Sequence, residues 1–545
     1  MIKIFKKSNY IFFLIILFGF VLRIVSLNTN PPSMHADEAD TGYTALSLIQ
    51  TGMDPYGNSW PLHFQDQASN FKAPLYTYSV IPFVLFLGLN PVAERLPSVI
   101  FGILLIVSLY YLLRQYFTEK SIPLVGAFLV AINPWSIHLS RTGLEVQLSV
   151  LLTTAGILFF ELSKKKSYFI ILSFILFTLS LFSYHPAKIF TPLILIVLFM
   201  FNFSYIKKIK KYIGISLSIF LFGIIVLGYL AVFGKGASHF NDVSILDNSR
   251  AKIVVDSQRN QTTAPLNVSG IFSNKPIYFL RQFTNMYVGP LSISYLFING
   301  ENNLDKGIGN YGQYHLFELI PFIIGGFALW KRKKKIFLFV LIWFLIGLIP
   351  AGITRSGNYA YRDVNALIPP IILTSVGISV GFKYLYTQKR KFVLWLYVVM
   401  SFGFFTFFLY NYYFSYPVYS RDWWGYSQKE VLEYAVQNKD KYRSVVIDGG
   451  LDWAILYAFY YKTKPKVFQK AFDDATMVKG RLVIKIDGIY FGPVINESTK
   501  IDNVPFIASN SLLIAPSMYF KDQKALRYFY AVDGGTNLKA YEIKN

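Results

Sequence analysis

Residues 391–413 read KFVLWLYVVMSFGFFTFFLYNYY, and Lys391 is the only charged side chain among them. The hydrocarbon core of a bilayer is about 30 Å thick, so an α-helix needs about 20 consecutive apolar residues to cross it. A strand of a membrane barrel would instead alternate polar and apolar side chains, and that pattern is absent here. The segment therefore predicts a membrane-spanning helix.

Similar apolar runs recur along the whole chain. Of its 545 residues, 54% are hydrophobic and only 15% are charged, which lies outside the composition of ordinary soluble domains. We therefore predict a polytopic α-helical membrane protein with about 11–13 spans. The runs lie near residues 10–27, 74–90, 96–116, 121–138, 145–162, 167–183, 187–205, 212–233, 313–330, 336–350, 364–384 and 391–413.

The basic residues are distributed as in a membrane protein. The chain has 53 Lys and Arg against 30 Asp and Glu, a formal net charge of +23. Many of them cluster between apolar runs, as they do in the cytoplasmic loops of membrane proteins, so we expect no nucleic-acid partner. The chain contains no cysteine, which excludes disulfides and thiolate chemistry. The basic clusters lie at 164–166, 207–211, 331–335 and 389–391.

This charge pattern orients the predicted helices. With the clusters in the cytoplasm, residues 28–73, residues 233–313 and everything after residue 413 lie on the outer face of the plasma membrane. No small-residue cleavage site follows the first apolar run, so we expect it to remain as the first span. Eleven apolar runs then separate residues 28–73 from the segment after residue 413. Both segments are expected on the outer face, so the number of spans between them should be even. The region 74–138 should therefore contain a re-entrant turn near 88–91 or a break within 121–144.

Two domains are expected. Residues 1–413 would form the transmembrane module, and residues 414–545 would form a soluble extracytoplasmic α/β domain. The second segment contains short β-branched or aromatic runs typical of strands, and two longer runs typical of helices. The expected strands are 444–447, 482–486, 512–514 and 529–532, and the expected helices are 428–436 and 453–461.

The first outer loop carries the residues best suited to chemistry. Asp37 and Glu38 follow the first apolar run, and Lys72 precedes the next one. Asp37 is suited to accept a proton from a hydroxyl group, and Lys72 would lie at headgroup depth, where its charge suits a phosphate. The acids could equally be hydrated or stabilise the start of a helix. We expect that helix over 41–50, capped by Asp40 or the residue after it.

The motifs of this region together resemble a known family. They are similar to motifs of the protein O-mannosyltransferases and of their relatives that transfer aminoarabinose to lipid A. The resemblance is best over residues 1–200 and weaker at residues 355–362. It implies a GT-C fold and transfer of a sugar from a polyprenyl-phosphate donor outside the cytoplasmic membrane. The motifs are Asp37-Glu38-Ala39, Lys72-Ala73-Pro74-Leu75-Tyr76 and Glu94-Arg95-Leu96-Pro97-Ser98.

The resemblance also implies roles for individual residues. Asp37 matches the catalytic base of the family, Glu38 is its acidic neighbour, and Lys72 matches a residue that contacts the donor phosphate. Arg362, near the start of a late span, resembles a phosphate-binding arginine. From the residues alone, Lys72 and Arg362 could also be interfacial anchors whose charged ends reach the headgroups.

Residues 138–145 resemble a second outer acidic motif of the family. Glu145 would supply its carboxylate, at a position where some relatives have Asp, and Arg141 lies in the same motif. These two residues are four apart and could instead form a salt bridge on one face of a helix. The sequence leaves both readings open.

A sugar on a polyprenyl phosphate already carries a good leaving group. One base for the acceptor hydroxyl and cations for the departing phosphate are then sufficient, which predicts direct displacement with inversion. A divalent metal ion held by Asp37, Glu38 or Glu145 could add positive charge, although the sequence identifies no cofactor. The acceptor could be a protein, a lipid or a glycan.

Two other functions compete with this one. The first is a transporter or flippase of a lipid-linked saccharide, and the second is a non-catalytic receptor with the C-terminal segment as its binding module. Transporters usually place ionisable groups inside their spans, whereas the acids here lie in a loop. This placement favours an enzyme.

Overall fold

The computed structural model describes residues 2–66, 71–233, 244–355, 359–478, 481–492, 507, 509–516, 524–532 and 536–543. The chain divides into two compact units. The first contains Met1–Val25, Ser98–Ser140 and Glu145–Leu409, and the second contains Ser26–Pro97, Arg141–Leu144 and Tyr410–Asn545. The first outer loop thus belongs to the same unit as the C-terminal segment. The division into domains 1–413 and 414–545 stays a prediction.

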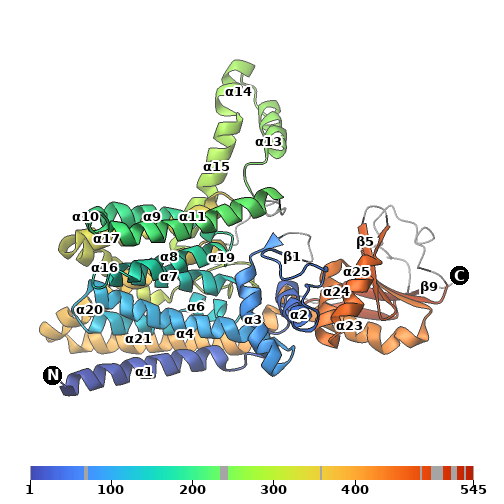
Figure 1. Ribbon diagram of the computed structural model, residues 1–545, viewed down its shortest axis with the longest axis horizontal. Helices are drawn as coiled ribbons and strands as arrows, with labels where there is room; N and C mark the ends of the chain where they lie inside the picture. Colours follow the sequence, from blue (N-terminus) through green and yellow to red (C-terminus); the bar gives the residue numbers. More distant parts are fainter. Residues whose placement is uncertain are drawn as a thin grey trace. The chain divides into compact units, whose positions relative to one another are not determined.

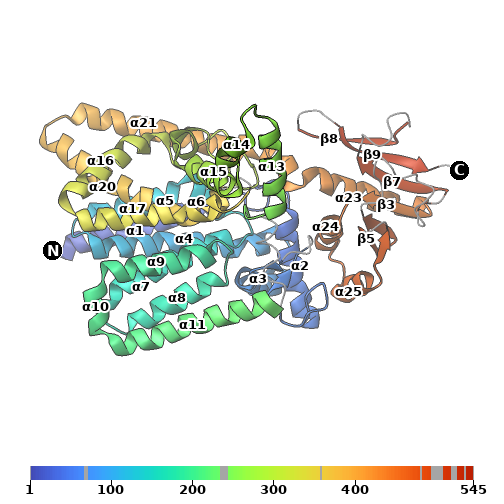
Figure 2. The same ribbon diagram turned by 90° about the horizontal axis from the view of Figure 1, so that it is seen from above.

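The first unit is a bundle of long apolar helices that run side by side (Figures 1 and 2). Among the described residues, six helices are long and apolar enough to cross a membrane, and five more apolar helices are shorter. The predicted polytopic α-helical fold is therefore confirmed. The main helices, some of which begin in the second unit, are α1 (Ile2–Ile24), α4 (Pro91–Tyr116), α5 (Ser121–Ile132), α7 (Val146–Ser163), α8 (Phe169–Leu181), α9 (Ala187–Phe201), α11 (Lys210–Phe233), α16 (Leu319–Arg332), α17 (Lys334–Gly347), α20 (Ile368–Thr387) and α21 (Lys391–Tyr410).

The run predicted over 121–138 is interrupted. Helix α5 ends at Ile132, and a short helix α6 (Pro134–Leu139) follows it. The Asn133 side chain caps α6 by accepting a hydrogen bond from the backbone N–H of Ser136 at 2.8 Å. Pro134 cannot donate the backbone hydrogen bond that would continue α5. A turn after α3 (Pro74–Leu87), at Gly88 with φ +72°, separates the preceding two runs.

A buried arginine stabilises this interruption. Arg23 on α1 is fully buried, and its guanidinium donates to the carbonyl oxygens of Val130 at 3.0 Å and Ala131 at 2.9 Å. The carbonyl of Val130 would normally accept from residue 134, which is a proline without an N–H group. Arg23 replaces that donor and thereby ties α1 to the end of α5.

The segment 233–313, predicted to lie on the outer face, contains more regular structure than its polar sequence suggests. It forms α13 (Asn248–Asn260), α14 (Leu266–Phe272) and α15 (Lys275–Val288). Figure 1 shows α13 and α15 side by side and directed across the bundle helices. Arg355 anchors the start of α13 through an ion pair with Asp247 at 3.0 Å.

The C-terminal part of the second unit is built on a seven-stranded mixed sheet. Strand β3 is parallel to both of its neighbours, and the other pairs are antiparallel. The strand order is β4 (Thr476–Val478), β5 (Arg481–Ile486), β6 (Ile489–Gly492), β3 (Ser444–Asp448), β7 (Ser511–Pro516), β9 (Thr536–Ile543) and β8 (Arg527–Tyr530). All four predicted strands are present: 444–447 and 482–486 agree within one residue, 512–514 ends two residues later than expected, and 529–532 begins and ends two residues earlier.

Three helices accompany this sheet. They are α23 (Tyr426–Asn438), α24 (Leu451–Tyr461) and α25 (Pro465–Asp473). Helices α24 and α25 contact β5, while α23 contacts β8 (Figure 2). Both predicted helices, 428–436 and 453–461, are confirmed, and with them the α/β character of this part of the chain.

The first outer loop is bound to this α/β part by polar contacts. Tyr43 donates to the carbonyl oxygen of Thr463 at 2.9 Å. The hydroxyls of Ser33 and Tyr460 are hydrogen-bonded at 2.9 Å, and Tyr460 also accepts from the backbone N–H of Met34 at 3.2 Å. These contacts explain why residues 26–97 group with the C-terminal segment.

Candidate active site

The helix that carries the loop acids starts earlier than predicted. Helix α2 extends over Ala36–Thr51, and its cap is His35, so the expected cap at Asp40 is wrong. The imidazole Nδ1 accepts from the N–H of Asp37 at 3.2 Å, and the Glu38 carboxylate accepts from the N–H of His35 at 3.3 Å. A histidine is not among the usual capping residues, which is why the sequence pointed further along. Both acids consequently lie in the first turn, where the helix dipole favours negative charge.

Asp37 faces solvent. Its side chain is 40% exposed, and its Oδ2 lies 3.4 Å from Nδ1 of His35. A carboxylate in this position is reachable by an acceptor hydroxyl, which is the first requirement of a general base.

Glu38 has the opposite environment. It is fully buried, and Arg95 donates to both of its oxygens, from Nε at 3.1 Å and from Nη2 at 2.7 Å. The N–H of Gly143 also donates to Oε1, at 2.7 Å. Two buried charges need a partner and good geometry to offset their loss of hydration, and this bidentate pair supplies both. Glu38 thus links α2 to Arg95 and to the backbone of Gly143.

Arg95 forms hydrogen bonds with the backbone that leads into the loop. Its guanidinium donates to the carbonyl oxygens of Leu27 at 3.1 Å, Pro31 at 3.0 Å and Ser33 at 2.5 Å. The ring of Trp424 lies 5.7 Å from its central carbon. The sequence singled out Arg95 only as part of a motif and did not indicate this function. The pairing joins positions 57 residues apart, which no local pattern reveals.

The second acidic motif contributes to the same cluster. A side chain at Gly143 would overlap the carboxylate of Glu94, so the close approach of these segments requires glycine there. Arg141 is fully buried and donates to the carbonyl oxygen of Asn30 at 2.7 Å. Its guanidinium also lies 5.2 Å from the ring centre of Tyr413. Arg141 thus lies in the same unit as Asp37 and Glu38.

Lys72, the predicted phosphate ligand, forms its ion pair with Asp40. Strand β2 (Phe71–Lys72), paired with β1 (Phe64–Gln65), carries the lysine. Its ammonium forms an ion pair with the buried Asp40 and donates to Oγ1 of Thr41 at 3.1 Å. Burial raises the pKa of the Asp40 carboxyl to about 6, and the charge of Lys72 opposes that shift. Asp40 lies three residues after Asp37 on α2, a spacing that places both on one face.

The remaining two predicted residues lie in the first unit, near one tyrosine. Arg362 donates to Oγ1 of Thr354 at 2.7 Å. Burial raises the pKa of the Tyr184 phenol; Glu145 raises it further, and Arg362 opposes the shift. The charges of Glu145 and Arg362 therefore both act on Tyr184. The structure thus places Asp37, Glu38, Lys72 and Arg141 in one unit, and Glu145 and Arg362 in the other.

The residues considered for a metal ion do not fit one. Among the described residues, no group of three or more His, Asp or Glu side chains is arranged to hold a metal. Both oxygens of Glu38 already accept hydrogen bonds from Arg95. No step proposed below therefore uses a metal held by Asp37, Glu38 or Glu145.

Comparison with known proteins identifies the fold. Residues 72–227 match the sequence model of the dolichyl-phosphate-mannose-protein mannosyltransferase family. This segment begins at Lys72 and includes the motif at 138–145. No curated protein sequence matches the chain.

Three solved structures, of two proteins, share the architecture over most of this chain. ArnT from Cupriavidus metallidurans, bound to undecaprenyl phosphate, is 10% identical, with a TM-score of 0.56 and 97% of each chain covered. Its apo form is 12% identical, also with a TM-score of 0.56 and 98% of each chain covered. The archaeal oligosaccharyltransferase AglB from Archaeoglobus fulgidus, in complex with an inhibitory peptide and a dolichol-phosphate, is 14% identical with a TM-score of 0.50. That match covers 84% of this chain and spans 64% of the length of AglB.

The predicted GT-C fold is thereby confirmed. Both solved proteins are membrane glycosyltransferases of this fold, and the matching family is of the same type. The chain is a multi-pass membrane protein with the GT-C architecture.

Proposed function

We propose that this protein is an integral-membrane glycosyltransferase. It moves a sugar from a polyprenyl-phosphate donor to an acceptor hydroxyl on the outer face of the plasma membrane. The family match at residues 72–227 supports this function, as do similar structures that were determined with undecaprenyl phosphate or dolichol-phosphate. The observation that carries it is the contrast between two adjacent acids, exposed Asp37 and fully paired Glu38.

Asp37 acts as the base in this mechanism. Its carboxylate takes the proton of the acceptor hydroxyl while the hydroxyl oxygen attacks the anomeric carbon of the sugar. The bond from that carbon to the phosphate oxygen breaks, and the polyprenyl phosphate leaves with the bonding electron pair. The phosphate needs no protonation, so a single base is enough, and the anomeric configuration inverts.

Positive side chains stabilise the departing phosphate. Lys72 is the first candidate, because it lies beside α2 and is only 14% exposed, which strengthens its electrostatic effect. Arg362 is the second, with Glu145 and Tyr184 in its vicinity. Glu38, Arg95 and Arg141 orient the loop and do not take part in proton transfer.

A transporter or flippase of a lipid-linked saccharide fits these observations less well. Transport sites are usually lined by ionisable groups within the membrane-spanning helices. Asp37, Glu38 and Lys72 lie instead on α2 and β2, which are outside the apolar helices.

Replacement of the base tests the proposal. Asp37→Asn should lower the rate of sugar transfer by a factor of about 10²–10⁴, the usual contribution of a general base, and should leave donor binding unchanged. Transfer is followed in proteoliposomes with a panel of labelled polyprenyl-phosphate sugars and cell-envelope acceptors, with mass spectrometry of the products. Asp440→Asn, an exposed acid of the C-terminal region, is the matched control. Full transfer by Asp37→Asn would refute its assignment as the base.

A further inference from the structure

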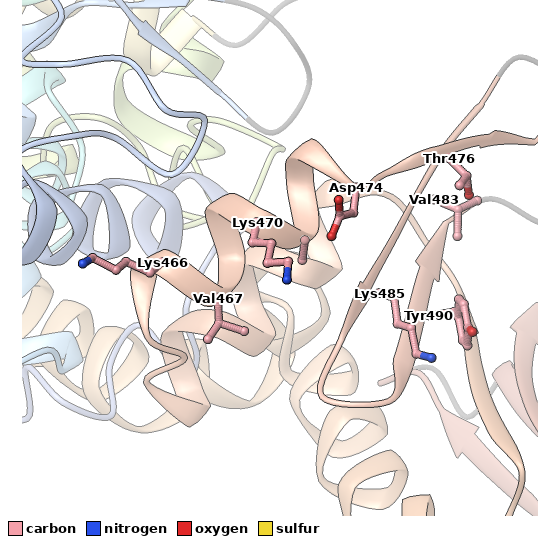
Figure 3. A pocket seen from close by; sticks show the side chains of 9 residues that line it. Lys466, Val467, Lys470, Asp474, Thr476, Val483, Lys485 and Tyr490 are labelled. Atoms are coloured by element: carbon pink, nitrogen blue, oxygen red, sulfur yellow. The ribbon is translucent and has the colours of Figure 1, made fainter.

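The C-terminal part of the second unit contains a cavity of about 500 Å³ between α25 and the strands β4 to β6 (Figure 3). Its volume is within the range of small-molecule binding sites. It is lined by Lys466, Val467, Lys470, Ala471, Asp474, Thr476, Val483, Lys485 and Tyr490. None of these residues belongs to the site described above.

Helix α25 carries two of the lining lysines; the side chain of Lys470 lies beside the other labelled residues, whereas that of Lys466 extends away from them (Figure 3). Lys466 and Lys470 are four residues apart and share one face of the helix. The opposite face is anchored by Phe468, which is fully buried and lies 5.4 Å from the ring of Tyr43 on α2. Because this contact fixes the rotation of α25 about its axis, Lys466 and Lys470 both project from the side of the helix opposite Phe468.

A third lysine comes from the sheet. Lys485 on β5 lies directly across from Tyr490 on β6. Its ammonium is 4.9 Å from the centre of the tyrosine ring, a cation–π contact that restricts the side chain. Figure 3 shows the two side chains next to each other across from α25.

The charge of the cavity is positive. Three lysines line it against one acid, Asp474, and within the described part of the chain none of the three forms an ion pair. Lysine ammonium groups suit phosphate as point charges, whereas arginine is preferred for flat bidentate contacts. Valine, alanine and tyrosine provide apolar surface for the carbon skeleton of a sugar or polyol. The lining therefore fits a phosphate group attached to such a skeleton.

The cavity has a defined relation to Asp37. Gln469 of α25 donates to the hydroxyls of Ser47 at 3.3 Å and Thr51 at 3.1 Å, near the end of α2. Asp37 is in the first turn of that helix, and 14 residues at 1.5 Å each place it about 20 Å from Thr51. A small acceptor cannot reach both places, whereas an extended chain can.

We propose that this cavity binds a phosphate group of the acceptor, and that the acceptor is long enough to extend from the cavity to Asp37. This inference rests on the proposed function and specifies its acceptor. A phosphate could also come from a lipid headgroup, and the experiment separates the two sources.

Binding is measured on the full-length protein in neutral detergent without any donor. The probe is a fluorescent oligomer of glycerol phosphate, followed by anisotropy. The variant Lys466→Gln/Lys470→Gln/Lys485→Gln should bind it at least tenfold more weakly than the wild type. The matched control, Lys439→Gln/Lys441→Gln/Lys524→Gln, removes the same charge elsewhere in the C-terminal region and should change affinity less than twofold. Circular dichroism establishes that both variants are folded.

Three results would overturn the proposal. The first is that the oligomer does not bind at all. The second is an equal loss of affinity in the two triple variants. The third is that nanodiscs containing phosphatidylglycerol bind to the protein while the oligomer does not. Asp37→Asn should bind the oligomer like the wild type. Loss of binding therefore tests the cavity, and loss of transfer in Asp37→Asn tests the proposed function.

Discussion

The buried pair of Glu38 and Arg95 allows a quantitative test of how the loop is held. In Glu38→Gln the Arg95 guanidinium would remain buried without its hydrogen-bonded countercharge, a loss that typically costs about 3–5 kcal/mol. Arg95→Met would leave the Glu38 carboxylate buried and would free three carbonyl oxygens, so a similar loss is expected. The double variant removes both charges. Its loss should be smaller than the sum of the single losses by about 2–3 kcal/mol, the upper part of the range for directly contacting residues.

Unfolding of the purified protein by SDS in mixed micelles, followed by tryptophan fluorescence, measures these differences. All four proteins are titrated under identical conditions, so that the double-mutant cycle gives the interaction free energy directly. The buried pair would not hold the loop if each single variant lost less than about 1 kcal/mol of unfolding free energy, or if the losses of the two single variants were additive. If Glu38→Gln abolished transfer while its stability was unchanged, Glu38 would instead take part in the chemistry.

Three further predictions concern the same unit. Donor affinity, measured by fluorescence quenching, should rise about fivefold as the pH falls through about 6, because protonation of Asp40 frees the charge of Lys72. The donor is a sugar-phosphate diester and keeps its own charge over this range. The variant Asp40→Asn should therefore bind the donor tightly at every pH. Gly143→Ala should lower the thermal midpoint by the equivalent of about 1–3 kcal/mol, since its methyl group would overlap the Glu94 carboxylate. Tyr460→Phe, which removes two hydrogen bonds to the loop, should cost about 1–2 kcal/mol and speed limited proteolysis within residues 26–66.

Each of these three predictions has its own control. The sign of the pH effect follows from the raised pKa: Asp40 is protonated below about 6 and ionised above it, so an affinity that rose with pH would contradict the assignment. Gly228→Ala is the control for Gly143→Ala, because a methyl group there meets nothing within 4 Å and alanine favours a helix. Tyr461→Phe, at an exposed position of the same helix, should leave proteolysis unchanged.

Local sequence was sufficient for the apolar helices and for the strands of this protein. A helix of apolar side chains and a strand of β-branched residues each depend on neighbours within a few positions. The runs around 391–413 and 444–447 could therefore be identified without any partner. The break after α5 was accessible in the same way, because Asn133 and Pro134 together end one helix and start the next.

The start of α2 was missed for a related reason. Its cap is an imidazole nitrogen of His35, and histidine has no strong preference for that position. Trp424 is one of an aromatic pair that follows the last apolar run, a placement typical of the membrane interface, but its indole is fully buried beside Arg95.

The sequence by itself determined that the chain is a helical membrane protein with an α/β C-terminal region, and it identified Asp37, Glu38 and Lys72 as the acids and cation of one loop. Only the tertiary structure decided their environments. Whether a carboxylate is a base or a support depends on burial and on its partner. Glu38 pairs with Arg95, which is 57 positions away in the sequence, and Lys72 pairs with Asp40, which is 32 positions away. Folding removes water from these charges, so each of them depends on a partner that is distant in the sequence. Asp37, two-fifths exposed, is the acid of the pair that folding left open to a substrate.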